Sequence, residues 1–287
     1  MKNTKGIILA GGSGTRLYPL STVYSKQLVA VYDKPMIYYP FSHLISVGIK
    51  EILIISNNES LFFYRKLFGD GNSLGLKVEY AEQNIPRGIA EAFIIGENFI
   101  GQDNVVLILG DNIFYGDFNI FAEAIKNNLA ATIFGIYVNE PERYGVIKYN
   151  SGVPEKIIEK PKDKISNYAV PGFYIYDSSV VDVAKKLLPS SRGELEITDI
   201  NNYYLSRNQL KVIKMQRGYS WLDSGTPESL LDAGNLVASL QQRQGLIIGS
   251  PEEAAFNSGF ISQDQFKAHI KNMPDCSYKS YLENLYL

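Results

Sequence analysis

Three short aliphatic runs constrain the fold of this chain more than any other feature. They are Gly6–Ala10, Glu51–Ile55 and Val105–Leu109, and none of them alternates apolar with polar residues. Strands of this kind are buried on both faces, as in a parallel sheet that is covered by helices. The runs alternate with helix-like stretches, which predicts an α/β fold. These stretches lie around residues 41–48, 60–68 and 89–98.

The pattern changes at about residue 131. Short strands joined by turns are predicted there, followed by a helix at 197–206 and a strand at 210–215, which indicates a mixed or antiparallel addition to the sheet. The short strands are Thr132–Val138, Tyr144–Tyr149, Glu155–Glu159 and Tyr168–Tyr176. Residues 227–243 have a helical pattern, and the rest of the chain is predicted to be a small helical appendage. The apolar face of 227–243 is predicted to consist of Leu230, Leu231, Leu236, Val237 and Leu240.

The charge balance argues against one class of function. The 287 residues carry 28 Lys and Arg against 30 Asp and Glu, a net charge of −2, so we expect no broad basic field for nucleic acid.

No apolar run approaches the roughly 20 residues of a membrane span, and the start of the chain has no signal-peptide pattern. The single Cys276 excludes an internal disulfide, and His43 and His269 are expected to have no catalytic role. We predict a cytoplasmic protein that binds neither nucleic acid nor a membrane.

A glycine-rich loop, Gly11–Arg16, follows the first aliphatic run. Glycine lets the backbone approach a ligand and present N–H groups to phosphate oxygens, and Arg16 adds a fork of donors. A P-loop is excluded because Thr15 and Arg16 follow Gly14, where that motif requires Lys and then Ser or Thr. The dinucleotide fingerprint is excluded because Arg16 or Leu17 stands in place of its third glycine. We predict that this loop binds an anion. The loop on its own does not identify a reaction.

Short motifs along the chain resemble those of one known family. Each motif is weakly specific, but their order and spacing together resemble the sugar-1-phosphate nucleotidyltransferases, from about Lys5 to the C-terminal helices. The resemblance is strongest to the members that use dTTP and glucose 1-phosphate. The motifs are Gly11–Leu17, Ser25–Leu28, Tyr32–Pro40, Leu109–Asn112, Pro141–Val146, Glu159–Pro161, Arg192–Asp199 and Trp221–Thr226.

The resemblance implies a fold and a reaction. The fold is a three-layer α/β/α arrangement, a Rossmann-like, mixed and mostly parallel sheet with helices on both faces. Its core would span residues 1–230, and a small C-terminal helical extension, 231–287, would belong to the same integrated domain. The reaction is the Mg²⁺-dependent transfer of a thymidylyl group from dTTP to glucose 1-phosphate, which releases pyrophosphate and gives dTDP-glucose. This step begins the synthesis of dTDP-deoxysugars, such as dTDP-rhamnose, for polysaccharides. The same chemistry with another nucleobase (UTP), or with another hexose or amino-sugar 1-phosphate, is the alternative.

The resemblance also implies roles for the cations. In such a reaction a sugar-phosphate oxygen attacks the α-phosphorus in line, so catalysis rests on positioning and on neutralising charge. Arg16 would hold the β- and γ-phosphates, and Lys26 would neutralise the α-phosphate. The sugar phosphate would be held by Lys160 and Arg192, and Glu194 either orients Arg192 or faces solvent.

Substrate recognition is assigned to a further set of residues by the same resemblance. Glu159 and the backbone at Gly145 would bind sugar hydroxyls. Gln83 would face the edge of the base, and Gly88 would let the backbone approach the thymine. The nucleotide-binding residues implied are Gly11, Gly12, Gly14, Thr15, Gln27, Gln83, Gly88 and Asp111.

Asp111 and Asp223 are the predicted metal ligands. Asp111 follows the run Val105–Leu109, and Asp223 follows Trp221 where a strand passes into a loop. Sheets of α/β proteins bind ligands at the carboxyl ends of their strands. Two carboxylates, completed by phosphate oxygens and waters, commonly hold Mg²⁺. Either aspartate alone would more often cap a helix or form a turn, but the order of the motifs favours metal binding.

A homotetramer and a second, regulatory site are the last implications of the resemblance. That site would lie between subunits, include Gly218, Glu253 and Asn257, and bind a downstream dTDP-sugar as an effector. Members of the family typically carry Arg where this chain has Asn257. We therefore predict weakened effector binding, unless Arg243 or Lys267 compensates.

Two other classes of protein are the alternatives. A dinucleotide-dependent oxidoreductase is disfavoured by the failed glycine fingerprint. A non-catalytic sensor of nucleotides or sugar phosphates would be expected to have lost Arg16, Lys26 or one aspartate, and all are present. Arg87 beside the base loop and Pro171 on the sugar side depart from the family pattern, which leaves the nucleobase and sugar preferences open.

Overall fold

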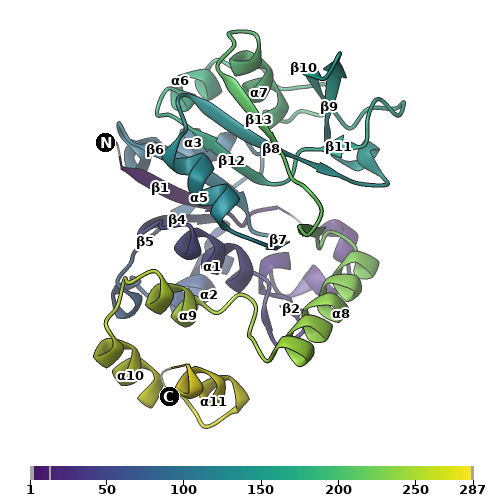
Figure 1. The fold of residues 1–287 in the computed structure, drawn as a ribbon. Helices are drawn as coiled ribbons and strands as arrows, with labels where there is room; N and C mark the ends of the chain where they lie inside the picture. Colours follow the sequence, from purple (N-terminus) through teal and green to yellow (C-terminus); the bar gives the residue numbers. More distant parts are fainter. Residues whose placement is uncertain (1–2, 13, 286–287) are drawn as a thin grey trace.

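The three aliphatic runs form the centre of one sheet. In the computed structural model, which describes residues 3–12 and 14–285, they are β1 (Thr4–Leu9), β4 (Glu51–Ser56) and β6 (Asn104–Leu109) (Figure 1). β1 lies between β4 and β6 and pairs with both in parallel. β5 (Lys77–Glu82), which the sequence pattern did not reveal, pairs in parallel with β4. The predicted parallel centre of the sheet is confirmed. Ser13 of the glycine loop lies outside the described residues.

A largely antiparallel half extends the sheet beyond β6. β12 (Phe173–Tyr176) pairs antiparallel with β6 on one side and with β8 (Ala131–Tyr137) on the other. The sheet ends with β11, β9 and β10, while β13 pairs with β8 in parallel. The bounds of these strands are β9 (Gly145–Asn150), β10 (Val153–Glu159), β11 (Tyr168–Ala169) and β13 (Leu210–Lys214). The predicted mixed addition is confirmed.

The single strand predicted over Tyr168–Tyr176 is two strands, β11 and β12. Pro171 interrupts them, because proline has no N–H to donate to a strand ladder. In the gap, the backbone N–H of Gly172 donates to Oδ1 of Asn112 (2.9 Å), and its carbonyl accepts from the N–H of Leu109 (3.0 Å). The interruption therefore ties this segment to the carboxyl end of β6.

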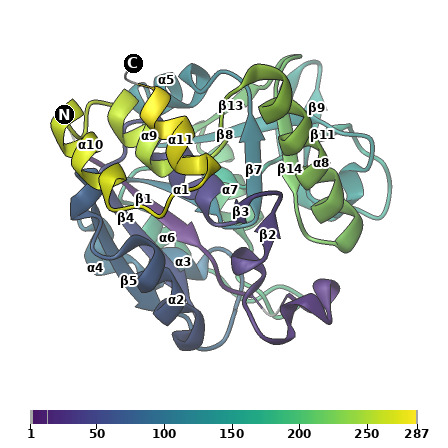
Figure 2. The ribbon, with the colours of Figure 1, turned by 90° about the horizontal axis from the view of Figure 1, so that it is seen from below.

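Helices cover both faces of the sheet, as predicted (Figures 1 and 2). Along β4, Ile52 and Ile54 belong to one apolar core, and Leu53 and Ile55 belong to the other. The first core includes α1, α2 and α5, and the second includes α3, α4, α6 and α7. The bounds are α1 (Tyr38–Ser46), α2 (Asn58–Phe68), α3 (Glu91–Ile95), α4 (Glu97–Ile100), α5 (Asn119–Lys126), α6 (Val180–Lys185) and α7 (Ile197–Leu205).

Two short antiparallel pairs and several 3-10 turns complete the core. β2 (Ala30–Val31) pairs with β3 (Lys34–Pro35), and β7 (Asn112–Tyr115) pairs with β14 (Ser220–Asp223). The sequence pattern revealed neither pair. The turns are η1 (Thr15–Leu17), η2 (Leu20–Thr22), η3 (Lys26–Leu28), η4 (Asn72–Leu74) and η5 (Pro141–Arg143).

Helix α8 (Pro227–Gln244) begins at a capping box and packs beside β2 and β14 (Figure 2). Its buried residues are Ala233 and Val237, with Leu230 packed against the same cluster. Leu231 is 64% exposed, so its predicted place on the apolar face is wrong. The neighbouring position of a helix lies about 100° further around the axis, which turns Leu231 away when Leu230 faces inward.

The C-terminal extension continues as predicted with α9 (Pro251–Asn257), α10 (Gln263–Lys271) and α11 (Ser277–Asn284). α9 packs against α1 of the core. The predicted boundary between residues 230 and 231 falls inside α8 and would divide a continuous helix. That the extension and the core form one domain stays a prediction.

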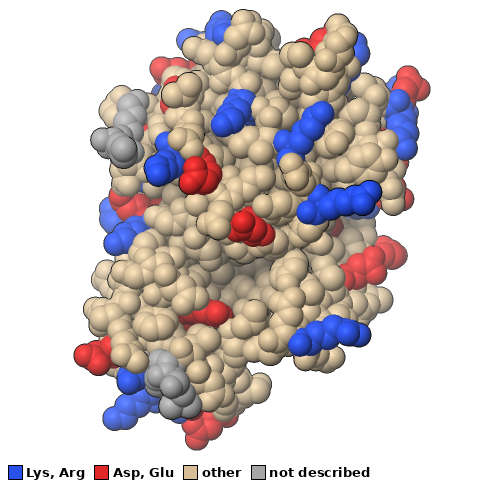
Figure 3. Space-filling model, in the orientation of Figure 1, with Lys and Arg blue, Asp and Glu red and all other residues tan. Residues whose placement is uncertain are grey.

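The helices and one face of the surface were compared with what a membrane or a nucleic acid would require. Within residues 3–12 and 14–285, no helix is long and apolar enough to cross a membrane. Figure 3 shows one face of the molecule, on which acidic and basic side chains are scattered without a broad field of either sign. This face gives no support to binding of a nucleic-acid backbone through phosphates.

His43 of α1 is buried in the first core. Its Nε2 donates to the carbonyl of Phe114 (2.9 Å), because a carbonyl can only accept. Burial lowers the pKa of His43 to about 4, and the hydrogen bond to Phe114 offsets this only in part. The imidazole is therefore neutral in the fold at pH values where an exposed histidine is charged.

We expect His43 to make the fold acid-sensitive. Between pH 6.5 and 4 the unfolded chain takes up a proton that the fold does not, so the free energy of unfolding falls as pH falls, by up to about 1.4 kcal/mol per pH unit. Denaturant unfolding of the wild type and of His43→Gln across this range measures the effect. The wild type should show the steeper dependence, and parallel curves would contradict the assignment.

Candidate active site

Two adjoining pockets lie at the carboxyl ends of the central strands. We call them the loop pocket, of about 230 Å³, and the strand-end pocket, of about 180 Å³; Arg16 and Asp111 line both. The loop pocket brings together most of the predicted nucleotide-binding residues. The predicted catalytic residues Arg16 and Lys26 join them, and the whole lining is Gly11, Gly12, Gly14, Thr15, Arg16, Lys26, Gln27, Asp111 and Gly225.

Gly11 is required by a close approach to Gln83. A Cβ at position 11 would lie 2.3 Å from Oε1 of Gln83. The Gln83 amide is held from its other side, because its Nε2 donates to Glu91 (2.8 Å). Gln27 donates from Nε2 to the carbonyl of Gly11 (3.3 Å), while its buried Oε1 has no hydrogen-bond partner among the described residues. A free acceptor at this position fits a ligand that brings a donor.

Gly88 lies outside both pocket linings. Its φ of +109° is in the region that favours glycine, and a Cβ there would lie 2.4 Å from the carbonyl oxygen of Leu195. The structure therefore gives Gly88 a packing role between the loop at 86–90 and the segment that precedes α7. The expected approach of its backbone to thymine stays a prediction.

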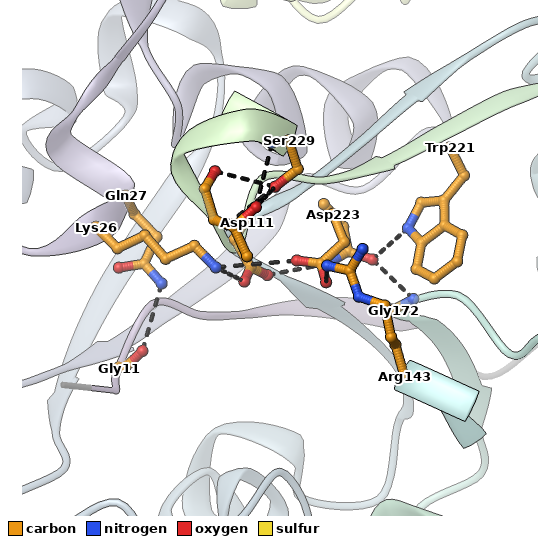
Figure 4. Close-up of polar contacts among 11 residues, drawn as sticks. Gly11, Lys26, Gln27, Asp111, Arg143, Gly172, Trp221, Asp223 and Ser229 are labelled. Atoms are coloured by element: carbon orange, nitrogen blue, oxygen red, sulfur yellow. Dashed lines mark hydrogen bonds and ion pairs between the residues drawn. The ribbon is translucent and has the colours of Figure 1, made fainter. Parts of the chain in front are cut away.

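The β7–β14 pair places the two predicted metal ligands side by side (Figure 4). Asp223, the last residue of β14, lies opposite Asn112 of β7, and the N–H of Ser224 donates to the carbonyl of Asp111 (3.3 Å). The Lys26 ammonium is ion-paired with Asp111 and lies 3.9 Å from Oδ1 of Asp223. All three side chains are at most one-fifth exposed.

The two carboxyl groups differ in their electrostatics. Burial acts to raise the pKa of Asp111, but the charge and hydrogen bond of Lys26 outweigh it and lower that pKa below its ordinary value. Burial, with the charge of Asp111, raises the pKa of Asp223, and Lys26 and Arg16 offset this only in part. Asp223 is thus a buried carboxyl without enough positive charge around it, and a further cation would stabilise its ionised form.

The donor set around Asp111 and Asp223 fits a hard divalent cation. Carboxylate oxygens are the ligands that such ions prefer. No group of three or more Asp, Glu, His or Cys side chains that could hold a metal occurs in the described part of the chain. The two aspartates would therefore need phosphate oxygens and waters to complete a coordination shell.

The strand-end pocket contains the predicted sugar-binding residues. Gly145 of β9 and Glu159 of β10 lie opposite each other, and Thr198 donates to Oε2 of Glu159 (2.5 Å). Lys160 also lines this pocket, and its φ of +40° is unusual for a residue with a side chain. The Lys160 N–H donates to the carbonyl of Tyr144 (2.9 Å), which fixes this turn beside the pocket.

Arg192 lies beside the strand-end pocket rather than in its lining. Its guanidinium is ion-paired with Glu196 (2.8 Å), Glu194 (3.1 Å) and Glu159 (3.6 Å). Of the two roles considered for Glu194, the structure has the one that orients Arg192. An incoming phosphate would share this guanidinium with glutamates, so the predicted clamp requires an exchange of partners.

Several pocket residues were not assigned by the sequence. Trp221 packs against the first core, lines the pocket and donates from Nε1 to Oδ1 of Asn112 (2.6 Å). Arg143 lines the pocket too, and its Nη2 lies 4.0 Å from Oδ2 of Asp223 (Figure 4). Arg143, Asn112 and Trp221 all stand within the quoted motifs, next to strand ends, and that position was the available signal.

The predicted effector residues meet at a third pocket, of about 330 Å³, where α1, β7 and α9 come together. Figure 3 shows this face hollowed near its centre. Glu253 and Asn257 line it, and the carbonyl of Gly218 lies beside Gly116, another lining residue. Ser42 Oγ and His43 Nδ1, also in the lining, are buried and have no hydrogen-bond partner among the described residues.

Comparisons with known proteins agree with this geometry. The family model for nucleotidyl transferases matches residues 5–239. Glucose-1-phosphate thymidylyltransferases of Mycolicibacterium smegmatis and Neisseria meningitidis are each 48% identical to this chain, over 98% of it and 98–99% of their own length. A solved structure of a putative glucose-1-phosphate thymidylyltransferase from Bacillus anthracis superposes with a TM-score of 0.76 at 43% identity, covering 81% of this chain and 94% of that one. A UDP-glucose pyrophosphorylase at 23% identity and a TM-score of 0.73, covering 83% of this chain and 99% of that one, shares the fold.

The chain belongs to the nucleotidyl transferase family and is a nucleotidyltransferase enzyme. Enzymes of this family generally use a divalent metal. The two bacterial relatives and the Bacillus anthracis structure carry one name, glucose-1-phosphate thymidylyltransferase.

We predict that Asp223→Asn lowers turnover by about a hundredfold or more while the fold persists, because it removes a carboxylate without breaking a short ion pair. Asp111→Asn should lose as much turnover and also some stability, since it leaves Lys26 buried without its partner. Turnover at saturating metal, with thermal unfolding, measures both effects.

Asp103→Asn is the matched control. Asp103 pairs with Lys5 (3.0 Å) at the opposite end of β6 from Asp111, so its turnover should match the wild type. Wild-type turnover for Asp223→Asn would contradict the two-aspartate site.

Proposed function

We propose that this chain transfers a thymidylyl group from dTTP to glucose 1-phosphate, giving dTDP-glucose and pyrophosphate. One observation carries the proposal: two adjoining pockets, of about 230 and 180 Å³, share Arg16 and Asp111 in their linings. Each pocket has a further cation of its own, Lys26 in the loop pocket and Lys160 in the strand-end pocket. The relatives described above support the choice of substrates. In the cell this would be a cytoplasmic step, the first toward dTDP-deoxysugars such as dTDP-rhamnose for polysaccharides.

The residues divide into two groups in this mechanism. In the loop pocket, backbone N–H groups of the glycine loop and Arg16 hold the β- and γ-phosphates, and Lys26 faces the α-phosphate. At the strand-end pocket, Lys160 from the lining and Arg192 from beside it hold the sugar phosphate, whose oxygen attacks the α-phosphorus in line. Bringing two anions together in a chain of net charge −2 requires such local cations.

Mg²⁺ is the proposed metal, and Asp111 and Asp223 are its proposed ligands. A bound divalent cation neutralises charge on the phosphate oxygens in the transition state. Gln83 and Gln27 would recognise the base, with Gly88 close to it. Glu159 and the backbone at Gly145 would bind sugar hydroxyls, since Glu159 is held in place by Thr198.

A matrix of nucleoside triphosphates against sugar 1-phosphates, read by pyrophosphate release, tests the proposed function. The highest kcat/KM is expected for dTTP with glucose 1-phosphate. Preference for UTP, or for another hexose or amino-sugar 1-phosphate, would replace the substrates but keep the reaction. Release with none of the pairs would overturn the proposal.

Kinetics should separate the roles of the cations. Lys26→Ala is expected to lower kcat/KM for both substrates by about a hundredfold, because its charge acts where the bond changes. Arg192→Ala should mainly raise KM for the sugar phosphate, by about tenfold, since a clamp supplies similar binding in ground and transition states. Steady-state kinetics with each substrate varied, alongside thermal unfolding, gives the comparison. One shared kinetic signature for the two variants would refute these roles.

We further propose that the protein is a homotetramer and that the pocket of Glu253 and Asn257 is an effector site for a dTDP-sugar. The unpartnered Ser42 Oγ and His43 Nδ1 support a ligand there. No Lys or Arg is among its described lining residues, and neither Arg243 nor Lys267 contributes to it. Within one subunit the effector's phosphates would thus lack a cation, which supports the prediction of weak inhibition.

Replacing Asn257 by Arg should strengthen inhibition. A charge-assisted contact in place of a neutral one is worth about 1–2 kcal/mol, roughly a tenfold tighter effector. The measurement is inhibition by dTDP-rhamnose at fixed dTTP, for the wild type and Asn257→Arg. Strong inhibition of the wild type at low concentration, or no gain in the variant, would show that Asn257 does not set the affinity.

A further inference from the structure

Asn201 lies beneath the strand-end pocket with part of its amide unused. It is on α7, one turn after Thr198, and both residues line the pocket. Asn201 is only 1% exposed, and its Nδ2 has no hydrogen-bond partner among the described residues. A buried amide that is left half satisfied is costly, and it is kept where a ligand completes it.

Tyr176 fixes the orientation of this amide. Its hydroxyl donates to Oδ1 of Asn201 (2.5 Å), and burial raises the pKa of Tyr176 well above its ordinary value, so the hydroxyl keeps its proton. The ring of Tyr176 is itself held between Phe93 at an edge and Tyr204 in a stack. With Oδ1 occupied, the N–H groups of Asn201 are the part of the amide that has no partner among the described residues.

The next residue, Asn202, differs from Asn201 in that both ends of its side-chain amide are hydrogen-bonded to the backbone. Its Oδ1 accepts from the N–H of Ile157 (2.9 Å), and its Nδ2 donates to the carbonyl of Ile157 (2.8 Å). That amide is satisfied on both sides by β10. An amide nitrogen without a hydrogen-bond partner is therefore not a general property of the asparagines of α7.

The surroundings of Asn201 select the kind of group that can complete it. The part of the lining that α7 supplies, Ile197, Thr198 and Asn201, carries no charge, and the Thr198 hydroxyl already donates to Glu159. A neutral oxygen acceptor on a compact polar ligand fits such a wall better than a phosphate does. Sugar hydroxyls are acceptors of this kind.

We propose that Asn201 donates a hydrogen bond to one hydroxyl of the sugar 1-phosphate, and that Tyr176 acts as the positioning residue which aims it. This inference rests on the proposed function and adds a residue that selects the sugar. A site that hydrogen-bonds a substrate hydroxyl discriminates against analogues that lack it, because its own buried group is then unpaired.

A cycle of enzyme and substrate variants tests the proposal. The wild type and Asn201→Ala are assayed with dTTP and glucose 1-phosphate, and then with each of its monodeoxy analogues. We expect kcat/KM of the wild type to fall about tenfold or more for one analogue. Asn201→Ala should show a similar loss with glucose 1-phosphate, no further loss with that analogue, and an unchanged KM for dTTP.

Two further variants keep the result decisive. Tyr176→Phe retains Asn201 but releases it, so the discrimination against the same analogue should shrink, which also serves if Asn201→Ala does not fold. Asn202→Ala is the matched control and should alter stability but leave the pattern across the analogues as in the wild type. Equal losses across every analogue for Asn201→Ala or Tyr176→Phe would overturn the proposal.

The cycle is distinguishable from the test of the proposed function. If the wild type prefers another hexose 1-phosphate, the same cycle is run with monodeoxy analogues of that sugar. A coupling between Asn201 and one hydroxyl would then support this inference although the substrate assignment had failed.

Discussion

The buried ion pair between Lys26 and Asp111, with Asp223 beside it, is the interaction on which the rest of the site depends. Charges removed from water are stable only when they are paired, so the surrounding chain must hold all three groups in place. The parallel pairing of β1 with β6 brings the glycine loop next to Asp111. The β7–β14 pair then adds Asp223 from more than one hundred residues further along the chain.

Three of the active-site cations are already engaged by carboxylates in this structure. Lys26 pairs with Asp111, Arg143 lies near Asp223, and Arg192 pairs with three glutamates. Because carboxylates neutralise these cations, a chain of net charge −2 can keep several Lys and Arg side chains close together at the two pockets. The pairing also means that a phosphate must displace or share a carboxylate partner. When a substrate binds, its phosphate would therefore replace a carboxylate as the ionic partner of a cation. A divalent cation beside Asp111 and Asp223 would favour this exchange, because it would pair with the carboxylates.

The sequence was sufficient for the parts of the fold that local pattern controls. Continuous aliphatic runs such as Val105–Leu109 identify strands buried on both faces, and the same pattern places Asp111 at a strand end. The sequence placed a strand end at Asp223 but did not reveal β7 or its pairing with β14, because a four-residue pair stabilised by partners far apart in the chain has no local signature. Leu231 was misplaced because the apolar face of α8 is narrow, with Ala233 and Val237 buried, Leu230 packed beside them and Leu231 64% exposed.

The site was predictable to a similar degree. The motif order identified the glycine loop, Lys26 and both aspartates, which the structure brings together. It did not reveal the glutamates around Arg192, since several acidic residues in one segment do not indicate which of them turn toward the guanidinium. Asn201 gave no signal either, because its distinguishing property is a missing partner, and only the folded chain has that property.

In the proposed reaction the thymidylyl group passes directly between two anions, without a covalent enzyme intermediate. The most direct test uses dTTP made chiral at the α-phosphorus by a sulfur atom and follows the configuration into the dTDP-glucose product. One in-line attack by the sugar phosphate inverts that centre, so inversion is the predicted result. Retention would require two successive displacements and would contradict the account.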